Sequence, residues 1–334
     1  MQAYVLHRYG GPEAWEPREV PRPVPKRGEL LVKVHAAGLN PVDYKTREGM
    51  LRPIVDYTLP IVAGNELAGV VEEVGEGVEG FAGGEAVFAR VDKQSLGAFA
   101  EYAAVRADLV ATKPPSLDFV SAAGAPLAGV TALQALRDEL QVAPGQRIFI
   151  SGGAGGVGTF AIQIAKGLGA EVTTTASARG ADLVRSLGAD QVVDYATENW
   201  EATLRDFDGA FDLIGGDSLL KTFRVVKRGA KVVSIAGMPE PTTAQRDLHA
   251  GGMLAAAFWV ASLRIRVEAW RYGATYRYLF MRESGADLSD LATLLGSGRL
   301  RVVLDRVYPF AQIAEAMRFL EEGHAKGKVV VQMK

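Results

Sequence analysis

Three glycines with a fixed spacing give this chain its clearest chemical signal. They are Gly153, Gly155 and Gly158, which form the pattern G-x-G-x-x-G inside the segment RIFISGGAGGVGTFAIQIAK at 147–166. A β-branched run precedes them and apolar residues at helical spacing follow, so we predict a strand, a tight turn and a helix. The first glycine would permit the turn, the second would let backbone approach a pyrophosphate, and the third would let the helix pack on the strand. Because a helix N-terminus favours phosphate, the pattern predicts dinucleotide binding; an ordinary glycine-bearing turn is the alternative.

The end of the next predicted strand, at 171–176, indicates which dinucleotide is bound. This end should lie beside the adenosine ribose, where a carboxylate would hold the ribose hydroxyls of NAD. No acid is present there, and Ser177 and Arg179 follow instead. A hydroxyl and a guanidinium suit a 2′-phosphate, since charge-assisted hydrogen bonds from arginine contribute roughly 1.5–3 kcal/mol each. We therefore predict NADPH rather than NADH, unless Arg179 is an ordinary solvated loop residue.

Length and composition restrict the class of protein. A chain of 334 residues exceeds the usual size of a single core, so two domains are expected. The net charge of −2 gives no electrostatic footprint for nucleic acid or an anionic membrane, and neither is expected as a partner. The most apolar stretch, 253–263, is too short to span a bilayer, and the N-terminal MQAYVLHRYG lacks the features of a signal peptide. We expect a cytoplasmic protein.

The absence of cysteine excludes several chemistries together. Disulfides, cysteine-ligated zinc, iron–sulfur clusters and thiol nucleophiles all require it. The four histidines are scattered and show no H-x-x-x-H or H-x-E spacing, so each is expected to be structural.

The hydrophobic pattern changes once along the chain. From 30 to 105, short alternating runs separated by glycine clusters predict a compact antiparallel barrel. From about Leu127 the pattern becomes strand, helix, strand, which predicts an α/β doubly wound parallel sheet. Its expected strands are 147–151, 171–176, 191–195, 210–214, 231–235 and 276–281. An amphipathic segment at 312–322 and a strand at 328–333 end the chain. The expected domains are 1–126 with 284–334, and 127–283.

The two halves together resemble one known family. The segments GLNPVDYKTREG (38–49), GNELAGVVEEVGEGVEGF (64–81), PLAGVTALQAL (126–136), SGGAGGVGTFAIQIAK (151–166) and GHAKGKVVV (323–331) carry the resemblance. They are similar to those of zinc-independent medium-chain dehydrogenases/reductases of the quinone oxidoreductase, zeta-crystallin-like type. The resemblance spans essentially the whole chain and implies a GroES-like β-barrel catalytic domain, a Rossmann domain and bound NADPH.

Two positions differ from the zinc-dependent relatives of this superfamily. Those enzymes place a metal-binding cysteine where this chain has Asn40 and a metal-binding histidine where it has Asn65. A neutral amide is a poor zinc ligand, so we expect no metal site and no alcohol oxidation that uses zinc as Lewis acid.

Without a metal, hydride should go to an acceptor that is already electrophilic, and the protein must stabilise the charge that builds on its carbonyl oxygen. By resemblance Asn40 lies near the nicotinamide, where its NH₂ would donate to substrate or cofactor; an asparagine bonded to its own turn is the alternative. Asp43 and Arg47 have the spacing of a helical ion pair and are expected to be structural. Tyr44 and Lys45 remain as catalytic candidates. The pattern D-x-K-x-R-x-G resembles the branch that includes plant alkenal/one reductases, in which an ammonium at Lys45 would stabilise an enolate; a solvated surface lysine is the alternative.

The resemblance also implies the residues that contact the cofactor. It assigns Gly155, Gly156 and Val157 to the pyrophosphate turn, together with Gly153 and Gly158 of the glycine pattern. Further expected contacts are Ser177 and Arg179 at the 2′-phosphate, Tyr195 at the adenosine, Thr131, Ala236 and Gly237 near the nicotinamide, and Lys328 in the C-terminal motif. Thr131 and Tyr195 are the two for which a purely structural role is the strongest alternative.

These observations predict an NADPH-dependent oxidoreductase that reduces quinones, enones or enals without metal. A metal-free NADPH-dependent carbonyl reductase, or a non-catalytic NADPH-binding protein with a structural or redox-sensing role, would show the same motifs. The aromatic-rich run 258–280 departs most from the family pattern. Its side chains belong to the core, to a substrate pocket or to a subunit contact, and this run together with the habit of the family favours a homodimer.

Overall fold

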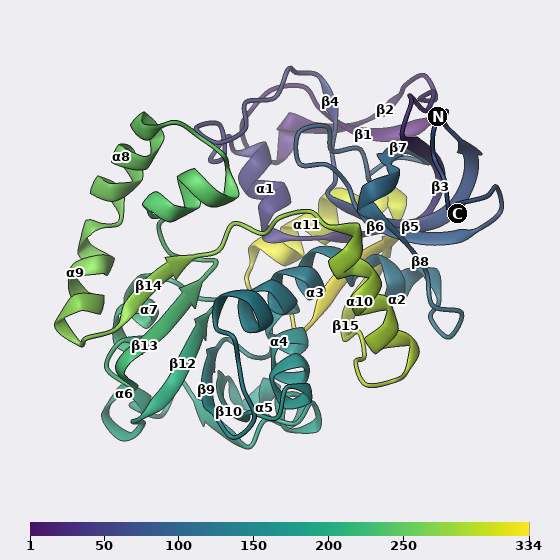
Figure 1. The fold of residues 1–334 in the computed structure, drawn as a ribbon. Helices are drawn as coiled ribbons and strands as arrows, with labels where there is room; N and C mark the ends of the chain where they lie inside the picture. The colour runs from purple at the N-terminus through teal and green to yellow at the C-terminus, as the bar shows by residue number, and fades with distance from the viewer. Residues whose placement is uncertain (334) are drawn as a thin grey trace. The chain divides into compact units, whose positions relative to one another are not determined.

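A computed structural model describes residues 1–333 of the chain. The chain divides into two compact units, which are treated separately below: unit 1 is Met1–Val130 with Glu283–Lys334, and unit 2 is Thr131–Arg282 (Figure 1). The sequence placed the divisions after residues 126 and 283. The first turn of helix α3 (Pro126–Leu133) lies in unit 1 because the N–H of Leu127 donates to Glu66 of that unit at 2.7 Å.

Unit 2 contains a six-stranded parallel sheet. The strand order is β11-β10-β9-β12-β13-β14, so the chain starts in the middle of the sheet and winds outward in both directions, which confirms the predicted doubly wound class. The strands are β9 (Arg147–Ser151), β10 (Glu171–Ala176), β11 (Gln191–Asp194), β12 (Phe207–Asp212), β13 (Val226–Ser234) and β14 (Thr275–Tyr278).

Three of these strands differ in position from the prediction. Strand β12 begins three residues earlier than expected, at Phe207 instead of Ala210, and β13 begins at Val226 instead of Lys231. The early part of β13 reads VKRG and is largely exposed, so it lacks the apolar pattern that marked the rest of the strand. Strand β14 ends at Tyr278, three residues before the expected end at Met281.

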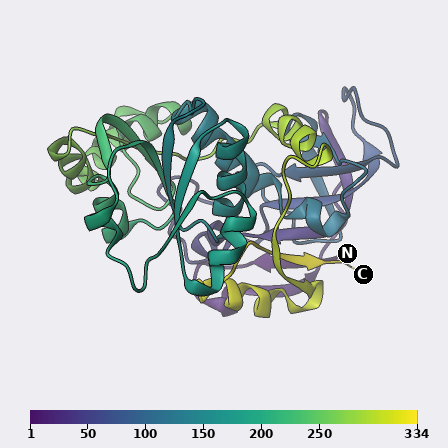
Figure 2. The ribbon, with the colours of Figure 1, turned by 90° about the horizontal axis from the view of Figure 1, so that it is seen from below.

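Helices connect the strands of unit 2 and pack on its sheet. Helix α4 packs on β9 and β10, α5 on β10 and β11, α7 on β12 and β13, and α9 on β14; Figure 2 shows helices on both sides of these strands. Phe149, Phe207 and Phe223 lie in a fully buried cluster of this unit. The helices are α4 (Gly156–Gly167), α5 (Ala178–Ser186), α6 (Trp200–Thr203), α7 (Gly216–Thr222), α8 (Gly252–Ala261) and α9 (Leu263–Arg271), with π-helices η3 (Gln134–Glu139) and η4 (Thr243–Asp247).

Unit 1 is built around one long strand, β3 (Glu29–Leu39). Along one edge β3 pairs with β5, and along the other edge its first half pairs with β7 and its last residues pair with β16. The resulting sheet has the order β15-β16-β3-β5-β6-β8, is antiparallel except for the β15–β16 pair, and is accompanied by a three-stranded sheet β2-β1-β4. This arrangement confirms the predicted GroES-like antiparallel domain, to which the C-terminal segment adds β15 and β16.

The remaining elements of unit 1 are short. Its other strands are β1 (Gln2–Leu6), β2 (Trp15–Glu19), β4 (Ile61–Val62), β5 (Glu66–Val74), β6 (Ala86–Arg90), β7 (Tyr102–Arg106), β8 (Val110–Thr112), β15 (Leu304–Pro309) and β16 (Lys328–Gln332). Its helices are α1 (Pro41–Arg47), α2 (Phe119–Ala123), α10 (Gly285–Gly296) and α11 (Ile313–Glu321), with 3-10 turns η1 (Pro12–Ala14), η2 (Ala107–Leu109) and η5 (Phe310–Gln312). In residues 1–333, no helix combines the length and apolar character that a membrane span requires.

Candidate functional site

The glycine-rich turn of unit 2 joins β9 to α4, and steric contacts explain its glycines. Gly152 has φ of 75°, the left-handed conformation that favours glycine. A Cβ on Gly153 would lie 2.2 Å from Thr174 Oγ1, and a Cβ on Gly158 would lie 2.4 Å from the carbonyl oxygen of Gly152. The prediction that Gly153 permits the tight turn is therefore wrong: Gly152 makes the turn, and Gly153 is required because β10 passes so close.

The N-terminus of α4 is suited to an anion. Gly155 is the N-cap residue, and Thr159 is the first residue whose N–H bonds to its carbonyl, at 3.0 Å, so the first-turn N–H groups of Gly156, Val157 and Gly158 precede the helical ladder. A Cβ on Gly155 would meet only the Gly152 oxygen, at 3.5 Å, so the glycine leaves space in front of these groups. The turn therefore fits a pyrophosphate, with backbone donors and the helix dipole supplying the attraction.

The end of β10 is held against this turn. Thr175 accepts a hydrogen bond from the N–H of Gly152 on its Oγ1 at 2.9 Å, and its carbonyl accepts from the N–H of Gly153 at 3.0 Å. In the first turn of α5, a Cβ on Gly180 would lie only 2.9 Å from the Cβ of Ala154 in the glycine turn. These contacts bring the start of α5 alongside the start of α4.

Ser177 and Arg179 lie at that start of α5. Ser177 is its N-cap residue and makes no side-chain capping bond, while Arg179 is exposed. Neither side chain has a polar partner within the described residues 1–333. Tyr195 follows β11 directly and is 59% exposed, so its ring is available to a ligand.

A buried carboxylate that sequence reasoning missed connects the ends of three strands. Asp212 ends β12 and accepts hydrogen bonds from Ser151 Oγ of β9 at 2.9 Å and from Ser234 Oγ of β13 at 2.7 Å. It also accepts from the N–H of Gly215 at 3.0 Å. Burial raises the pKa of Asp212, while these hydrogen bonds oppose that shift. The sequence signal that was missed is an acid at the end of an apolar strand, shortly before the glycine pair Gly215 and Gly216.

This network fixes the loop that contains Ala236 and Gly237. Ser234 Oγ accepts from the N–H groups of Ala236 at 3.1 Å and Gly237 at 2.9 Å while it donates to Asp212. Gly237 must lack a side chain because its Cβ would lie 2.3 Å from Tyr276 Oη. Asp212 thus orients both loops that follow β12 and β13 at the carboxyl end of the sheet, where ligands of doubly wound folds bind.

Unit 1 contains a second buried polar cluster, centred on Asn40, Glu66 and Lys328. Asn40 Nδ2 donates to Glu66 Oε1 at 2.7 Å, and Lys328 Nζ donates to the same oxygen at 2.8 Å. Lys328 Nζ also donates to Asn40 Oδ1 and, at 3.0 Å, to the carbonyl oxygen of Leu39. All three side chains are almost fully buried. The ammonium therefore fixes which end of the Asn40 amide faces Glu66.

This cluster gives Lys328 a role that the sequence did not predict. An ammonium has three hydrogens, and here Glu66, Asn40 and Leu39 accept all of them. Lys328 therefore orients Asn40, and its expected contact with the cofactor stays a prediction. Sequence reasoning missed Glu66, although an acid at the start of one apolar run and a lysine at the start of another were a readable signal.

Glu66 also bonds to the start of helix α3. Its Oε2 accepts a hydrogen bond from the N–H of Leu127 and so caps this helix, which contains the buried Thr131. A Cβ on Gly38 would lie 2.3 Å from Glu66 Oε1, so glycine at this position of β3 makes room for the carboxylate.

Asp43 extends the cluster. Its carboxylate accepts from the N–H of Asn40 at 2.7 Å and from Asn65 Nδ2 at 2.6 Å. Burial raises the pKa of Asp43 to about 7; the Glu66 carboxylate raises it further, while the two hydrogen bonds and Lys328 oppose the shift. The group is thus divided between two protonation states near neutral pH.

The predicted ion pair between Asp43 and Arg47 is wrong. Arg47 is buried and pairs with Glu321 of α11 at 2.7 Å and with Glu48 at 3.4 Å. The helical spacing was correct, but Arg47 reaches Glu321 of α11, while the Asp43 carboxylate accepts hydrogen bonds from Asn40 and Asn65. Tyr44 is half-buried against the core, and burial raises the pKa of its phenol. Lys45 is partly exposed, and its ammonium has no polar partner in the described part of the chain.

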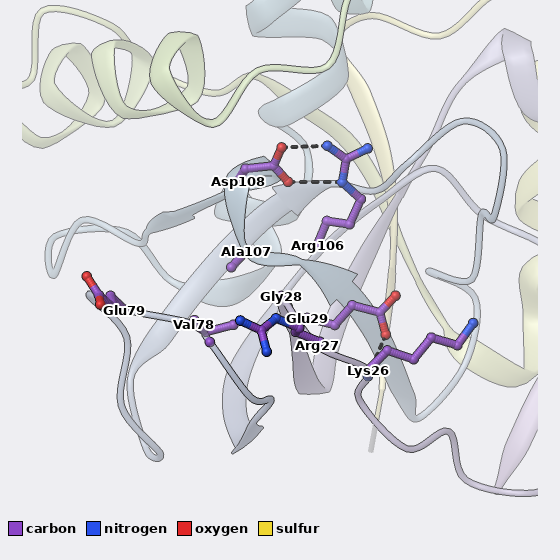
Figure 3. A pocket seen from close by; sticks show the side chains of 10 residues that line it. Lys26, Arg27, Gly28, Glu29, Val78, Glu79, Arg106, Ala107 and Asp108 are labelled. Carbon is purple, nitrogen blue, oxygen red and sulfur yellow. Dashed lines mark hydrogen bonds and ion pairs between the residues drawn. The ribbon is translucent and has the colours of Figure 1, made fainter.

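A surface hollow of unit 1 lies elsewhere and contains no predicted site residue (Figure 3). Two of its cationic side chains already have partners: Arg106 pairs with Asp108, and Arg27 pairs with Glu76. Because none of the residues expected to bind cofactor or substrate lines it, this hollow is not the candidate site.

Comparison with known proteins agrees with both units. The model of the alcohol dehydrogenase GroES-like domain matches residues 26–115, and that of the zinc-binding dehydrogenase domain matches residues 187–331. The NADPH-dependent alkenal/one oxidoreductase of Arabidopsis thaliana chloroplasts is 37% identical over 99% of this chain and 79% of its own length. The chain belongs to the medium-chain dehydrogenase/reductase family, in its quinone and alkenal/one oxidoreductase branch.

Solved structures of this family have the same fold. The quinone oxidoreductase of Coxiella burnetii superposes with a TM-score of 0.86 at 30% identity, covering 100% of this chain and 99% of its own. The Escherichia coli quinone oxidoreductase, solved in complex with NADPH, gives a TM-score of 0.84 at 25% identity, covering 99% and 100%.

Within this family the candidate cluster does not suit zinc. Asn40 and Asn65 present neutral amides, and each amide is already hydrogen-bonded to a carboxylate of the cluster. The Lys328 ammonium forms an ion pair with the Glu66 carboxylate at 2.8 Å, so this carboxylate already has a cationic partner.

Proposed function

We propose that this protein is an NADPH-dependent oxidoreductase that transfers hydride, without a metal, to quinones or to α,β-unsaturated carbonyl compounds. The observation that carries the proposal is the Asn40 amide, whose NH₂ is fixed by Glu66 and Lys328 in a cluster unsuited to zinc. The names of the similar proteins, an NADPH-dependent alkenal/one oxidoreductase and quinone oxidoreductases, support the same substrate classes.

NADPH binds, in this proposal, along the carboxyl end of the sheet of unit 2. The first-turn N–H groups of α4 hold the pyrophosphate, while Ser177 and Arg179 bind the 2′-phosphate. Tyr195 contacts the adenosine, and Ala236 and Gly237, held by Ser234, contact the nicotinamide end together with Thr131. The bound cofactor supplies a hydride equivalent.

Asn40 stabilises the charge that hydride transfer creates. One hydrogen of its NH₂ bonds to Glu66 Oε1, and the second has no acceptor among residues 1–333. This second hydrogen donates to the carbonyl oxygen of the acceptor, which gains negative charge in the transition state. Lys328 and Glu66 hold the amide so that no reorientation is required. Lys45, whose ammonium has no partner in the same described range, is the second candidate donor for an enolate.

A panel of acceptors tests the function. NADPH oxidation is followed at 340 nm with 9,10-phenanthrenequinone, 1,4-benzoquinone, 2-cyclohexenone and a 2-alkenal, and with a saturated ketone as comparison. We expect turnover with quinones or conjugated carbonyls and none with the saturated ketone. Turnover of the saturated ketone would indicate a carbonyl reductase, and stoichiometric NADPH binding without turnover would indicate a non-catalytic protein.

The cellular location and assembly state remain predictions. The sequence favours a cytoplasmic homodimer without nucleic-acid or membrane partners, whereas the Arabidopsis relative is chloroplastic. Fractionation of the source cells tests the location.

A further inference from the structure

The loop that follows β13 presents a large apolar side chain at the carboxyl edge of the unit 2 sheet. Met238 comes directly after Ala236 and Gly237, the two residues expected at the nicotinamide, and it is 48% exposed. The apolar residues of β13 itself, such as Val232 and Val233, are fully buried. Met238 is thus an apolar side chain that the core leaves uncovered.

The order of the strands gives Met238 its place relative to a bound dinucleotide. The order is β11, β10, β9, β12 and β13, and the carboxyl ends of parallel strands lie at one edge. Tyr195 follows β11, the glycine turn follows β9, and Met238 follows β13. Because we expect the adenosine and the pyrophosphate at the first two positions, Met238 lies toward the nicotinamide end. Ile214, which follows β12, instead lies against the glycine turn, where its Cδ1 would be 2.7 Å from a Cβ on Gly152.

Hydrogen bonds fix the backbone at Met238. Ser234 Oγ accepts from the N–H groups of Ala236 and Gly237, the two residues before it. The carbonyl of Met238 itself accepts from Tyr276 Oη of β14 at 2.8 Å. The position of the Met238 side chain is therefore set by a rigid loop.

The charges that follow in this loop are turned toward unit 2. Glu240 is buried and pairs with Arg277 of β14 at 3.0 Å, and Asp247 is buried and pairs with the same guanidinium at 2.5 Å. Arg246 pairs with the buried Glu139 of η3. Each charge of residues 239–247 thus has a partner of opposite sign within unit 2. A ligand that meets this loop meets the thioether and no unpaired charge from these residues.

We propose that Met238 is a specificity-determining residue that packs on the alkyl chain of the acceptor, so that the enzyme prefers long-chain 2-alkenals. This assignment rests on the proposed function, because it requires an acceptor at the nicotinamide. In a 2-alkenal the alkyl chain is attached to the β-carbon, the atom that accepts the hydride. The β-carbon must approach the nicotinamide to ~3–3.5 Å, so the chain begins beside the residues that flank this ring. A flexible, polarizable thioether packs well on such a chain.

The chain length of the acceptor tests this contact. Each methylene that Met238 covers should raise kcat/KM by up to about fourfold, the equivalent of ~0.8 kcal/mol, so the parent should prefer 2-octenal to 2-butenal. Met238→Gln keeps the length of the side chain but adds a polar amide. It should lower kcat/KM about tenfold for 2-octenal and less than about twofold for 2-butenal, whereas Met238→Leu should retain the preference. Met253→Gln is the matched control, because Met253 is 89% exposed on α8 of the same unit and should affect neither acceptor.

The Kd for NADPH, measured by fluorescence titration, should be the same in the parent and in Met238→Gln. A tenfold weaker Kd would place Met238 against the cofactor and overturn the proposal. An equal loss of kcat/KM for both enals, or no loss for either, would also overturn it. A parent that reduces quinones or enones but shows no preference for the longer enal would overturn it and leave the proposed function intact. A parent that reduces none of these acceptors would contradict the proposed function, and this assignment with it.

Discussion

Asn40 shows how a buried residue of ordinary type acquires a specific chemical function. An asparagine amide has an acceptor end and a donor end, and in isolation nothing distinguishes the two orientations. Here the Lys328 ammonium donates to the amide oxygen of Asn40, and Glu66 accepts from the amide nitrogen, so one orientation of the amide is enforced. In a buried site of low dielectric, a donor fixed in this way loses no energy to reorientation when charge develops on a substrate oxygen.

Replacing Asn40 with alanine should therefore reduce kcat by ~10²–10³-fold, the range for losing one preorganised donor, with little change in the Kd for NADPH. The matched control is Asn65→Ala, which removes a buried amide of the same cluster that donates only to Asp43. Steady-state kinetics with 2-cyclohexenone and NADPH fluorescence titration measure both quantities. If Asn65→Ala loses as much kcat as Asn40→Ala, then the cluster acts only through stability.

Arg179→Ala should weaken NADPH binding by roughly ten- to hundredfold, corresponding to about 1.5–3 kcal/mol, and leave NADH binding nearly unchanged. Arg185→Ala on the same helix is the control, because Arg185 pairs with Asp182 at 3.1 Å and should affect neither cofactor. Isothermal titration of both cofactors gives the comparison. An equal loss for NADPH and NADH would assign Arg179 a structural role.

Asp43 should make stability depend on pH near neutrality. In the unfolded chain its carboxyl ionises near the ordinary aspartate value of 3.8, whereas burial raises its pKa to about 7 in the folded chain. Between pH 3.8 and pH 7 the folded state binds more protons at Asp43 than the unfolded state does. The stabilisation that comes from protonated Asp43 is therefore fully present below the unfolded pKa and is lost as the pH rises through the folded pKa of about 7. Asp43→Asn removes the titrating carboxyl group. It also replaces one acceptor oxygen with an NH₂, so either the Asn40 N–H or the Asn65 NH₂ loses its acceptor, at a cost of about 1–3 kcal/mol.

The Tm difference between the parent and Asp43→Asn, measured from pH 5 to pH 8, isolates this effect from other titrating groups. We expect the Tm of the parent to exceed that of Asp43→Asn by less as the pH rises. A difference that stays constant or grows with pH would contradict a raised pKa for Asp43.

At the scale of elements, the turn from β9 to α4 depends on close backbone packing as much as on phosphate binding. Gly158 approaches the carbonyl oxygen of Gly152, a backbone atom that cannot move without opening the turn. Gly167 ends the same helix, and a Cβ there would meet nothing within 4 Å. These two glycines form a matched pair.

Gly158→Ala should lower the Tm by several degrees and weaken NADPH binding at least tenfold, because the added Cβ forces the helix away from the turn. Gly167→Ala should be neutral or stabilise the protein by about 0.5–1 kcal/mol, since alanine has the higher helix propensity. Thermal unfolding and NADPH titration measure both. An unchanged Tm and Kd for Gly158→Ala would mean that the contact relaxes without cost.

The elements were predictable from the sequence wherever a repeating pattern specified them. Strand β9, helix α4 and strand β10 were placed within a residue or two because glycine punctuation, β-branched runs and helical spacing agree there. Strand β13 was predicted too short, because its exposed start VKRG has no apolar pattern. Contacts that depend on the fold had no local signal, so Arg47 was assigned to Asp43 although α11 brings Glu321 within 2.7 Å.

At the scale of the whole molecule, the predicted site residues belong to two compact units with different expected tasks. Unit 2 contains the glycine turn, Ser177 and Arg179, a set that suits binding of a dinucleotide. Unit 1 contains Asn40 in its charged cluster, a set that suits chemistry on an acceptor. Sequence predicted this division of labour, but not Glu66 or Asp212, which orient the predicted residues through contacts between distant segments.

Hydride should pass from NADPH to the β-carbon of a conjugated acceptor. The most direct test incubates the enzyme with 2-cyclohexenone and NADPH deuterated at C4, each epimer in turn, and locates the deuterium in the product by NMR and mass spectrometry. We expect cyclohexanone with deuterium at C3, the former β-carbon, from one epimer only. Deuterium on the carbinol carbon of 2-cyclohexenol, or no transfer from either epimer, would contradict it.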